Sequence, residues 1–274
     1  MTRRQRWLGL AVSGLAIVGA AGWWYFGYAT PVGRGPAGPA VPRDAFAAPW
    51  TERPVLLLGL GDSVTAGFGA SAGKSYFARL AANPPDEFPE LRGLSLAAVC
   101  PKLTTRNLAI SGSESLHHEK VLERLPTYPP ETLGLVVFTT GGNDLIHPYG
   151  RAPPRECGMY GATYEQAAPW VDAFAARLTH MLDRVDAAFP GGCFVFLGTI
   201  YDPTDGVGDI EHAHANLPPW PDGTRLLAAY NDVLRRTAAA RRNVVLVDFH
   251  ADFLGHGIHC TQPWREHYAW RDPF

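Results

Sequence analysis

The chain has little charge of either sign. Only 18% of its 274 residues are charged, and 24 lysines and arginines against 26 aspartates and glutamates give a formal net charge of −2. Without an excess of positive charge, the chain has no electrostatic reason to bind nucleic acid. Because 46% of the residues are apolar, the chain can bury a good core. The part that follows the first fifty residues has a length that suits one α/β domain.

Charge is entirely missing from a long N-terminal segment, which follows three arginines and lasts until Arg34. Trp7 to Tyr28 supplies the roughly 20 apolar residues that cross a bilayer. Its end carries aromatic residues typical of the membrane interface, namely Trp23, Trp24, Tyr25 and Tyr28. We therefore expect residues 1–29 to anchor the chain in a membrane, with the rest on the extracytoplasmic side. A cleaved signal peptide, with small residues around Val18-Gly19-Ala20, is the alternative.

Cysteine is scarce, and no Cys-x-x-Cys spacing points to zinc or redox chemistry. The four cysteines are Cys100, Cys157, Cys193 and Cys260. An even number fits an oxidising compartment, where the four could pair into two disulfides by any of three connectivities. For Cys193, at the head of the apolar run CFVFLGTI, a simple role as a small core residue is equally consistent.

Residues 30–49 are rich in proline and glycine and lack an apolar period, so we expect a spacer there and a folded domain over 50–274. In that domain, short apolar runs predict strands buried on both faces at 54–60, 105–110, 133–140, 193–200 and 243–249. Stretches between them have helical spacing, at 75–82, 114–125, 164–189 and 224–241. This alternation predicts a three-layer α/β/α sandwich with a doubly wound, parallel five-stranded sheet.

The first expected strand runs directly into a hydroxyl and several glycines, in the sequence LLLGLGDSVTAGFGA at residues 56–70. Ser63 therefore stands at a strand end among small residues, a place that suits a nucleophile. One alternative is that Asp62 or Ser63 only caps a helix. A phosphate-binding loop at GASAGKS is excluded, because the Walker spacing needs glycine where Phe68 stands.

The next two strand ends also carry groups that can donate hydrogen bonds. NLAISGSES ends the second strand with Gly112, and TTGGNDL ends the third with Asn143. Turn chemistry explains each motif alone, since turns favour Gly, Asn and Asp. It does not explain why three successive strand ends present such groups at the edge where the carboxyl ends of parallel strands meet.

These three motifs, in this order, resemble the blocks of the SGNH hydrolase superfamily, the GDSL lipase/esterase family. GDSVTAG resembles the first block, NLAISG the second and GGND the third, and the resemblance covers residues 54–260. It implies a flavodoxin-like SGNH fold and an acyl-serine mechanism with Ser63 as nucleophile. The oxyanion would be held by the backbone N–H groups of Ser63 and Gly112 and the side-chain amide of Asn143.

At the general base the sequence departs from the family pattern, because Asp-x-x-His is absent after Asp248. His259 stands where the family base would, and the residue three before it is His256 instead of aspartate. We expect His259 to be the base, oriented by a backbone carbonyl or by Asp252. The alternatives are His256, also with Asp252, and then His250 or His267.

Two other stretches leave questions open. The family usually closes with a helix, whereas TQPWREHYAWRDPF is too broken for one; if the chain is truncated, apolar surface should show on the sheet near the first strand. In residues 201–223, four acidic residues among glycines could bind calcium, although we favour a solvated loop at the substrate rim; they are Asp202, Asp205, Asp209 and Glu211. Four histidines are expected on the surface: His117, His118, His212 and His214.

The sequence thus predicts a membrane-tethered, extracytoplasmic serine hydrolase of carboxylic esters, with Ser63, Gly112, Asn143 and His259 as its catalytic groups. We expect a monomer that needs no cofactor or metal, binds a small-molecule, lipid or carbohydrate ester, and touches the membrane only through its N-terminal helix. Two alternatives remain open. One is an acyltransferase or deacetylase acting on a surface polysaccharide with the same groups, and the other is a non-catalytic binding protein that has lost the base.

Overall fold

The computed structural model describes residues 3–24, 41–212, 217–260 and 264. Five parallel strands form one sheet in the order β2-β1-β3-β4-β5. The strands are β1 (Val55–Gly61), β2 (Leu103–Asn107), β3 (Leu133–Thr139), β4 (Cys193–Gly198) and β5 (Val244–Val247). The predicted doubly wound α/β/α sandwich is confirmed.

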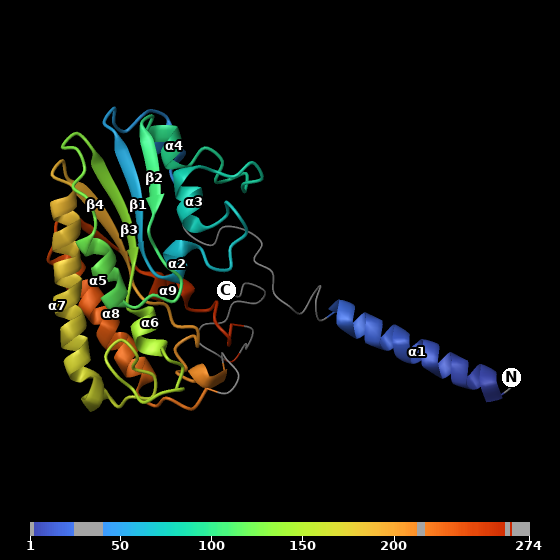
Figure 1. Cartoon of the computed structure of the whole chain (residues 1–274). Coiled ribbons are helices and arrows are strands. Elements are labelled where there is room, and N and C mark those ends of the chain that lie inside the picture. The colour runs from blue at the N-terminus through green and yellow to red at the C-terminus, as the bar shows by residue number, and fades with distance from the viewer. Residues whose placement is uncertain (1–2, 25–40, 213–216, 261–263, 265–274) are drawn as a thin grey trace.

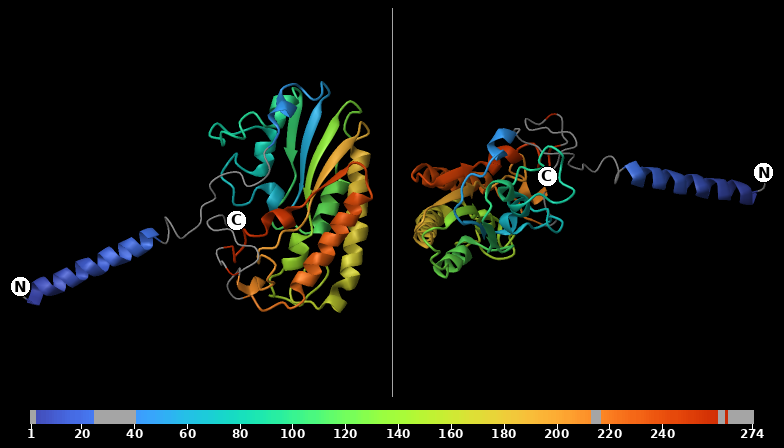
Figure 2. Two further views of the ribbon diagram at one scale, coloured as in Figure 1. Left: turned by 180° about the vertical axis from the view of Figure 1, so that it is seen from behind. Right: turned by 90° about the horizontal axis from the view of Figure 1, so that it is seen from above.

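Helices cover the two faces of the sheet unequally, as Figure 1 and Figure 2 show. The long helices α5 (Ser115–Glu123), α7 (Tyr164–Ala188) and α8 (Gly223–Ala239) pack on one face and on one another. The short helices α3 (Tyr76–Ala81) and α4 (Leu96–Val99) lie on the other face. The remaining short elements are η2 (Arg43–Phe46), α2 (Ser63–Ala66), α6 (Gly142–Ile146), η3 (Ile210–His212) and α9 (Phe249–Phe253).

The main core lies under the long helices. Alternate residues of the strands point to this face, among them Leu58, Phe138 and Val195, and meet the apolar stripe of α7. Helix α7 begins with a capping box, in which Thr163 and Gln166 each satisfy a backbone N–H of the other. The apolar residues that recur every three or four positions in WVDAFAARLTHMLDRVDAAF are those that the helix buries.

Burial of every strand on both faces was a wrong expectation. All residues of β1 are buried, but four of the five residues of β2 are exposed because β2 is an edge strand. On the face under α3 and α4, Phe194 and Val245 stay 47% and 45% exposed. Beside them lies an apolar cavity of about 570 Å³, lined by Leu57 and Phe196 among others. Short helices leave this side of the sheet partly uncovered, and the exposed apolar residues are on β4 and β5, whereas β1 itself is buried.

The N-terminal segment forms α1 (Arg3–Trp24), which is long and apolar enough to cross a membrane; none of its residues whose burial is described is buried. Residues 25–40, which hold most of the expected spacer, lie outside the described residues. Arg43, in the later part of the expected spacer, donates hydrogen bonds to the carbonyls of Pro89, Glu90 and Arg92 (3.2, 2.7 and 3.1 Å).

All four cysteines are buried and none is in a disulfide, so the disulfides that the sequence suggested are not formed. Each thiol has different neighbours. Cys157 contacts Ser115 and Asp144, whereas Cys193 contacts Asp186 and Asn243. Cys100 packs in a separate small core with Val55. Cysteine therefore gives no support for an oxidising compartment.

Candidate active site

Ser63 lies at the carboxyl end of β1, where the chain turns sharply into α2. Gly61 makes this turn possible: its φ is +113°, and a Cβ there would lie 1.8 Å from the carbonyl oxygen of Thr139 on β3. Asp62 is the N-cap of α2 and accepts a hydrogen bond from Val64 N (3.1 Å). Ser63 is half-buried and is not the cap, and its Oγ has no hydrogen-bonding partner among the described residues.

A series of hydrogen bonds between hydroxyl groups ends at the carboxylate of Asp62. Thr139 Oγ1 donates to Asp62 Oδ1 (2.7 Å), so the hydroxyl of Thr65 donates to Thr139 (2.9 Å) and that of Tyr76 donates to Thr65 (2.6 Å). Burial raises the pKa of Asp62, and the hydrogen bond from Thr139 opposes that rise. The turn that presents Ser63 is therefore tied to β3 and α3, which limits its freedom to move.

Gly112 and Asn143 lie at the ends of the two neighbouring strands, and Asn143 is hydrogen-bonded to the residue that follows Gly112. Gly112 follows β2 with a φ of +79°, and Asn143 is in α6, directly after β3. Asn143 Nδ2 donates to the carbonyl of Ser113 (2.9 Å), which leaves its second N–H available. The structure thus brings Gly112 and Asn143 to the edge of the sheet that carries Ser63, as the sequence predicted.

Asp144 fixes α6 against α5. It is fully buried and accepts hydrogen bonds from the backbone N–H of Ser115 (2.7 Å) and from the Ser115 hydroxyl. Arg177 of α7 also donates to that hydroxyl (2.8 Å) and pairs with Glu156. Burial raises the pKa of Asp144, while the hydrogen bonds from Ser115 oppose it. Sequence patterns do not predict these contacts, since Ser115, Asp144 and Arg177 are far apart along the chain.

His259 is paired with Asp209, a residue that the sequence did not single out as its partner. His259 Nε2 lies 2.8 and 2.9 Å from the two carboxylate oxygens of Asp209, and the ring is buried. Burial alone would raise the pKa of Asp209, but hydrogen bonds from His212 and His259 outweigh it and hold the pKa below its usual value. His259 Nδ1 is buried without a partner in the described part of the chain.

Asp252 is exposed and is not the carboxylate at His259. The expectation that it orients this ring is wrong, because Asp209, the residue before η3, is hydrogen-bonded to the ring instead. No ring nitrogen of the described residues lies within hydrogen-bond distance of Ser63 Oγ, although such bonds are often long before substrate binds. His256 packs beside Phe253, and His250 is half-buried. His267 lies outside the described residues.

The expected exposure of His118 was wrong, and His147 was not identified from the sequence. His118 was expected on the surface but is 3% exposed, because α5 turns it toward the sheet; His117 and His212 are exposed, and His214 lies outside the described residues. His147, one turn after Asn143, pairs with Glu114 (3.4 Å). Its Cε1 lies 4.0 Å from where a Cβ on Gly112 would be. The spacing of four residues from Asn143 could have drawn attention to it.

The acidic residues of 201–223 tie loops together and are not all solvated, contrary to our expectation. Asp205 is buried because it accepts hydrogen bonds from the backbone N–H groups of Gly255, Gly257 and His259 (3.0, 2.8 and 3.0 Å). Asp202 caps its own turn in the same way. In the described part of the chain, no three His, Cys, Asp or Glu side chains group as a metal site would need.

Comparison with known proteins gives one strong match. A family model described as "GDSL-like Lipase/Acylhydrolase family" matches residues 60–268. Among solved structures, a member of the lipolytic protein G-D-S-L family from Veillonella parvula is 14% identical, with a TM-score of 0.44 over 72% of this chain and 79% of that one. A variant of an acetyl xylan esterase from Geobacillus stearothermophilus is 18% identical, with a TM-score of 0.47 over 73% and 78%. No curated protein matches.

Proposed function

Because this chain belongs to the GDSL-like lipase/acylhydrolase family and is accordingly a carboxylic ester hydrolase, we propose that it works through an acyl-serine intermediate on Ser63. The Ser63 hydroxyl attacks the ester carbonyl, and the alcohol leaves. Water then attacks the acyl-serine, which releases the acid and restores the hydroxyl. In both steps the carbonyl oxygen becomes negative, and the N–H groups of Ser63, Gly112 and Asn143 are the donors that receive the charge.

The observation that carries this proposal is the arrangement of one free hydroxyl and two linked donors at one sheet edge. Ser63 Oγ is free of partners in the described residues, while Asn143 keeps an unused N–H beside the loop of Gly112. A turn that only capped a helix would need neither feature. The loss of one such donor costs about 2.7–4 kcal/mol of transition-state stabilisation.

We assign the general base to His259. Its Nε2 is held by Asp209, so Nδ1 is the nitrogen that would take the proton of Ser63 and return it to the leaving alcohol. The carboxylate keeps the ring oriented and stabilises the imidazolium, and the lowered pKa of Asp209 keeps it charged at neutral pH. His256 is the second candidate, and His147, beside Gly112, is the third.

We further propose that residues 1–29 anchor the protein in a membrane, that 30–49 act as a spacer and that 50–274 are the catalytic domain on the extracytoplasmic side. Support comes from α1, whose length and composition suit a membrane span, and from the arginines that precede it. The substrate would be a small-molecule, lipid or carbohydrate ester bound by a monomer. Release of acetyl groups from a surface polysaccharide would use the same groups.

The test is Ser63→Ala in the full chain, purified in detergent. We expect the variant to fold with an unchanged melting temperature and to lose hydrolysis of a short p-nitrophenyl ester. Its matched control is Ser71→Ala, a change at an exposed serine in the loop that follows α2, which should keep full activity. Unchanged turnover in Ser63→Ala would refute the nucleophile.

A fluorophosphonate probe, which labels activated serines, tests the base and the alternative of a binding protein. We expect the wild type to be labelled at Ser63 and His259→Ala to lose the label, with His256→Ala and His147→Ala unaffected. Loss of the label in one of the other two variants alone would move the base to that residue. Absence of labelling in the wild type would refute an activated serine and favour a binding protein.

A further inference from the structure

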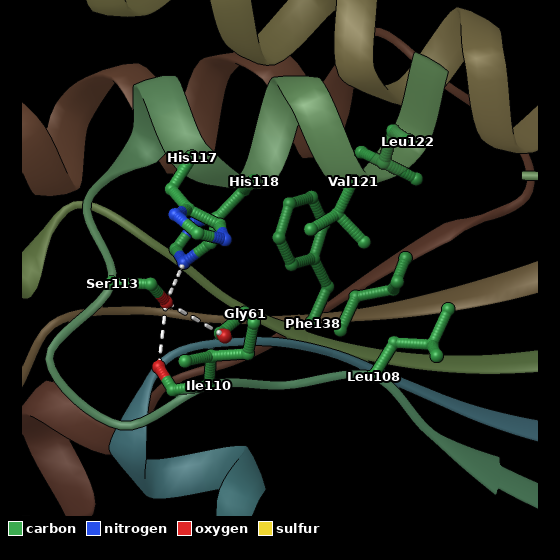
Figure 3. A pocket seen from close by; sticks show the side chains of 10 residues that line it. Gly61, Leu108, Ile110, Ser113, His117, His118, Val121, Leu122 and Phe138 are labelled. Carbon is green, nitrogen blue, oxygen red and sulfur yellow. Dashed lines mark hydrogen bonds between the residues drawn. The ribbon is translucent and has the colours of Figure 1, made fainter. Parts of the chain in front are cut away.

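A buried imidazole joins the loop after β2 to the end of β3. His118 of α5 is 3% exposed. Its Nε2 lies 2.7 Å from Ser113 Oγ and its Nδ1 lies 2.8 Å from Thr140 Oγ1. Figure 3 shows the ring above the loop, with Ser113 also bound to the carbonyls of Ile110 and Gly61. Both ring nitrogens are occupied, so this histidine has no nitrogen left for a substrate.

The donors and acceptors in the hydrogen-bonded chain Ser113–His118–Thr140 follow from the chemistry of the three side chains. The carbonyls of Ile110 and Gly61 only accept, at 2.6 and 3.1 Å, so the single hydrogen of the Ser113 hydroxyl goes to one of them. The hydroxyl must then accept from His118 Nε2–H. Because burial also keeps the ring neutral at pH 7, His118 Nδ1 carries no hydrogen and accepts one from the Thr140 hydroxyl. Burial lowers the pKa of His118 to about 3, in agreement with a neutral ring.

Each end of the chain lies next to one of the oxyanion donors. Ser113 follows Gly112 directly, and its own carbonyl accepts the hydrogen bond from Asn143. Thr140 begins the turn that leads through Gly141, with a φ of +96°, into α6 and Asn143. The hydrogen bonds of Ser113, His118 and Thr140 therefore link the two loops that carry these donors, so that neither loop can shift independently of the other.

We propose that Ser113, His118 and Thr140 are positioning residues, which hold Gly112 and Asn143 at the separation that the oxyanion requires. The proposal rests on the function proposed above. None of the three touches the reacting atoms; they act through the two donors. A displacement of about 1 Å at a reacting centre can lower a rate roughly 100-fold, so a lost hydroxyl at either end should be visible in kcat.

The experiment compares Thr140→Val with Thr140→Ser in the full chain, assayed on a p-nitrophenyl ester. Valine keeps the shape of threonine and removes the hydroxyl, whereas serine keeps the hydroxyl. We expect Thr140→Val to lower kcat by about 10- to 100-fold, with KM within about twofold, and Thr140→Ser to restore most of kcat. Thr104→Val, which removes a hydroxyl bonded to Val55 O near the amino ends of β1 and β2, should leave kcat unchanged.

Ser113→Ala removes the other end of the chain and serves if Thr140→Val does not fold; the same fall in kcat is expected. A lower melting temperature with unchanged kcat in both variants would mean that the chain only stabilises the fold, which would overturn the proposal. Equal losses in Thr140→Val and Thr140→Ser would also overturn it. Wild-type protein that hydrolyses no ester would instead refute the function on which the proposal rests, and the proposal with it.

Discussion

The neutral state of His118 predicts a specific loss of stability in acid. A histidine in the unfolded chain has a pKa of 6.5, whereas burial, with a smaller contribution from His117, lowers the pKa of folded His118 to about 3. Between these values the unfolded chain binds a proton that the folded protein does not. The free energy of unfolding therefore falls as the pH falls below 6.5, with a slope of up to about 1.4 kcal/mol per pH unit. Between pH ~6.5 and pH ~4 the loss amounts to roughly 3 kcal/mol.

Asp62 and Asp144 have pKa values raised by burial, so their contributions have the opposite slope, and total stability alone does not isolate His118. The assay is urea unfolding of the wild type and His118→Gln at several pH values. The glutamine variant should be less stable at pH 7, and the difference from the wild type should shrink as the pH falls. A difference that stays constant down to pH ~4 would contradict the neutral buried ring. If the variant does not fold, NMR titration of the His118 ring in the wild type measures the same pKa.

Three further predictions follow from the packing. Asp209→Asn should lower kcat at least about tenfold at pH 7 because the ring of His259 loses its charged partner, whereas Asp252→Asn should have no effect; equal effects of the two would contradict the pairing. In the wild type, the contribution of Asp209 to kcat requires its charged carboxylate, so it should be lost only as the pH falls through the lowered pKa of Asp209; a pH profile of kcat measures this. Gly61→Ala should lower the free energy of unfolding by more than about 3 kcal/mol, because the added Cβ would clash with β3. Gly69→Ala is the control: its φ is also positive (+81°), but an added Cβ there has no atom within 4 Å, so thermal unfolding should show a cost of about 1–2 kcal/mol. Similar costs for the two variants would show that the backbone relaxes where Gly61 approaches β3. In denaturant and without reductant, all four thiols should react with a thiol reagent; fewer than four reactive thiols would indicate a disulfide. In the native protein almost none should react, because the thiols are buried and burial raises the pKa of Cys157 and Cys193 to about 12.

The sequence by itself determined the order and type of the elements, because each depends on residues close together in the chain. Apolar runs separated by amphipathic segments predicted all five strands and four of the helices between them, α3, α5, α7 and α8, to within a few residues. It also determined which groups meet at the edge of the sheet. Parallel strands that alternate with helices must end on one side, so Ser63, Gly112 and Asn143 could be assigned to one edge before any coordinates.

Only the tertiary structure decided what surrounds these groups, because the contacts join residues that are distant in sequence. Asp209 reaches His259 across fifty positions, and Thr140 reaches His118 from another element. Burial is decided in the same way: a histidine on an amphipathic helix is exposed or buried according to where the sheet lies. Local sequence patterns specify secondary structure, whereas the partner of a polar side chain is set by how the layers pack.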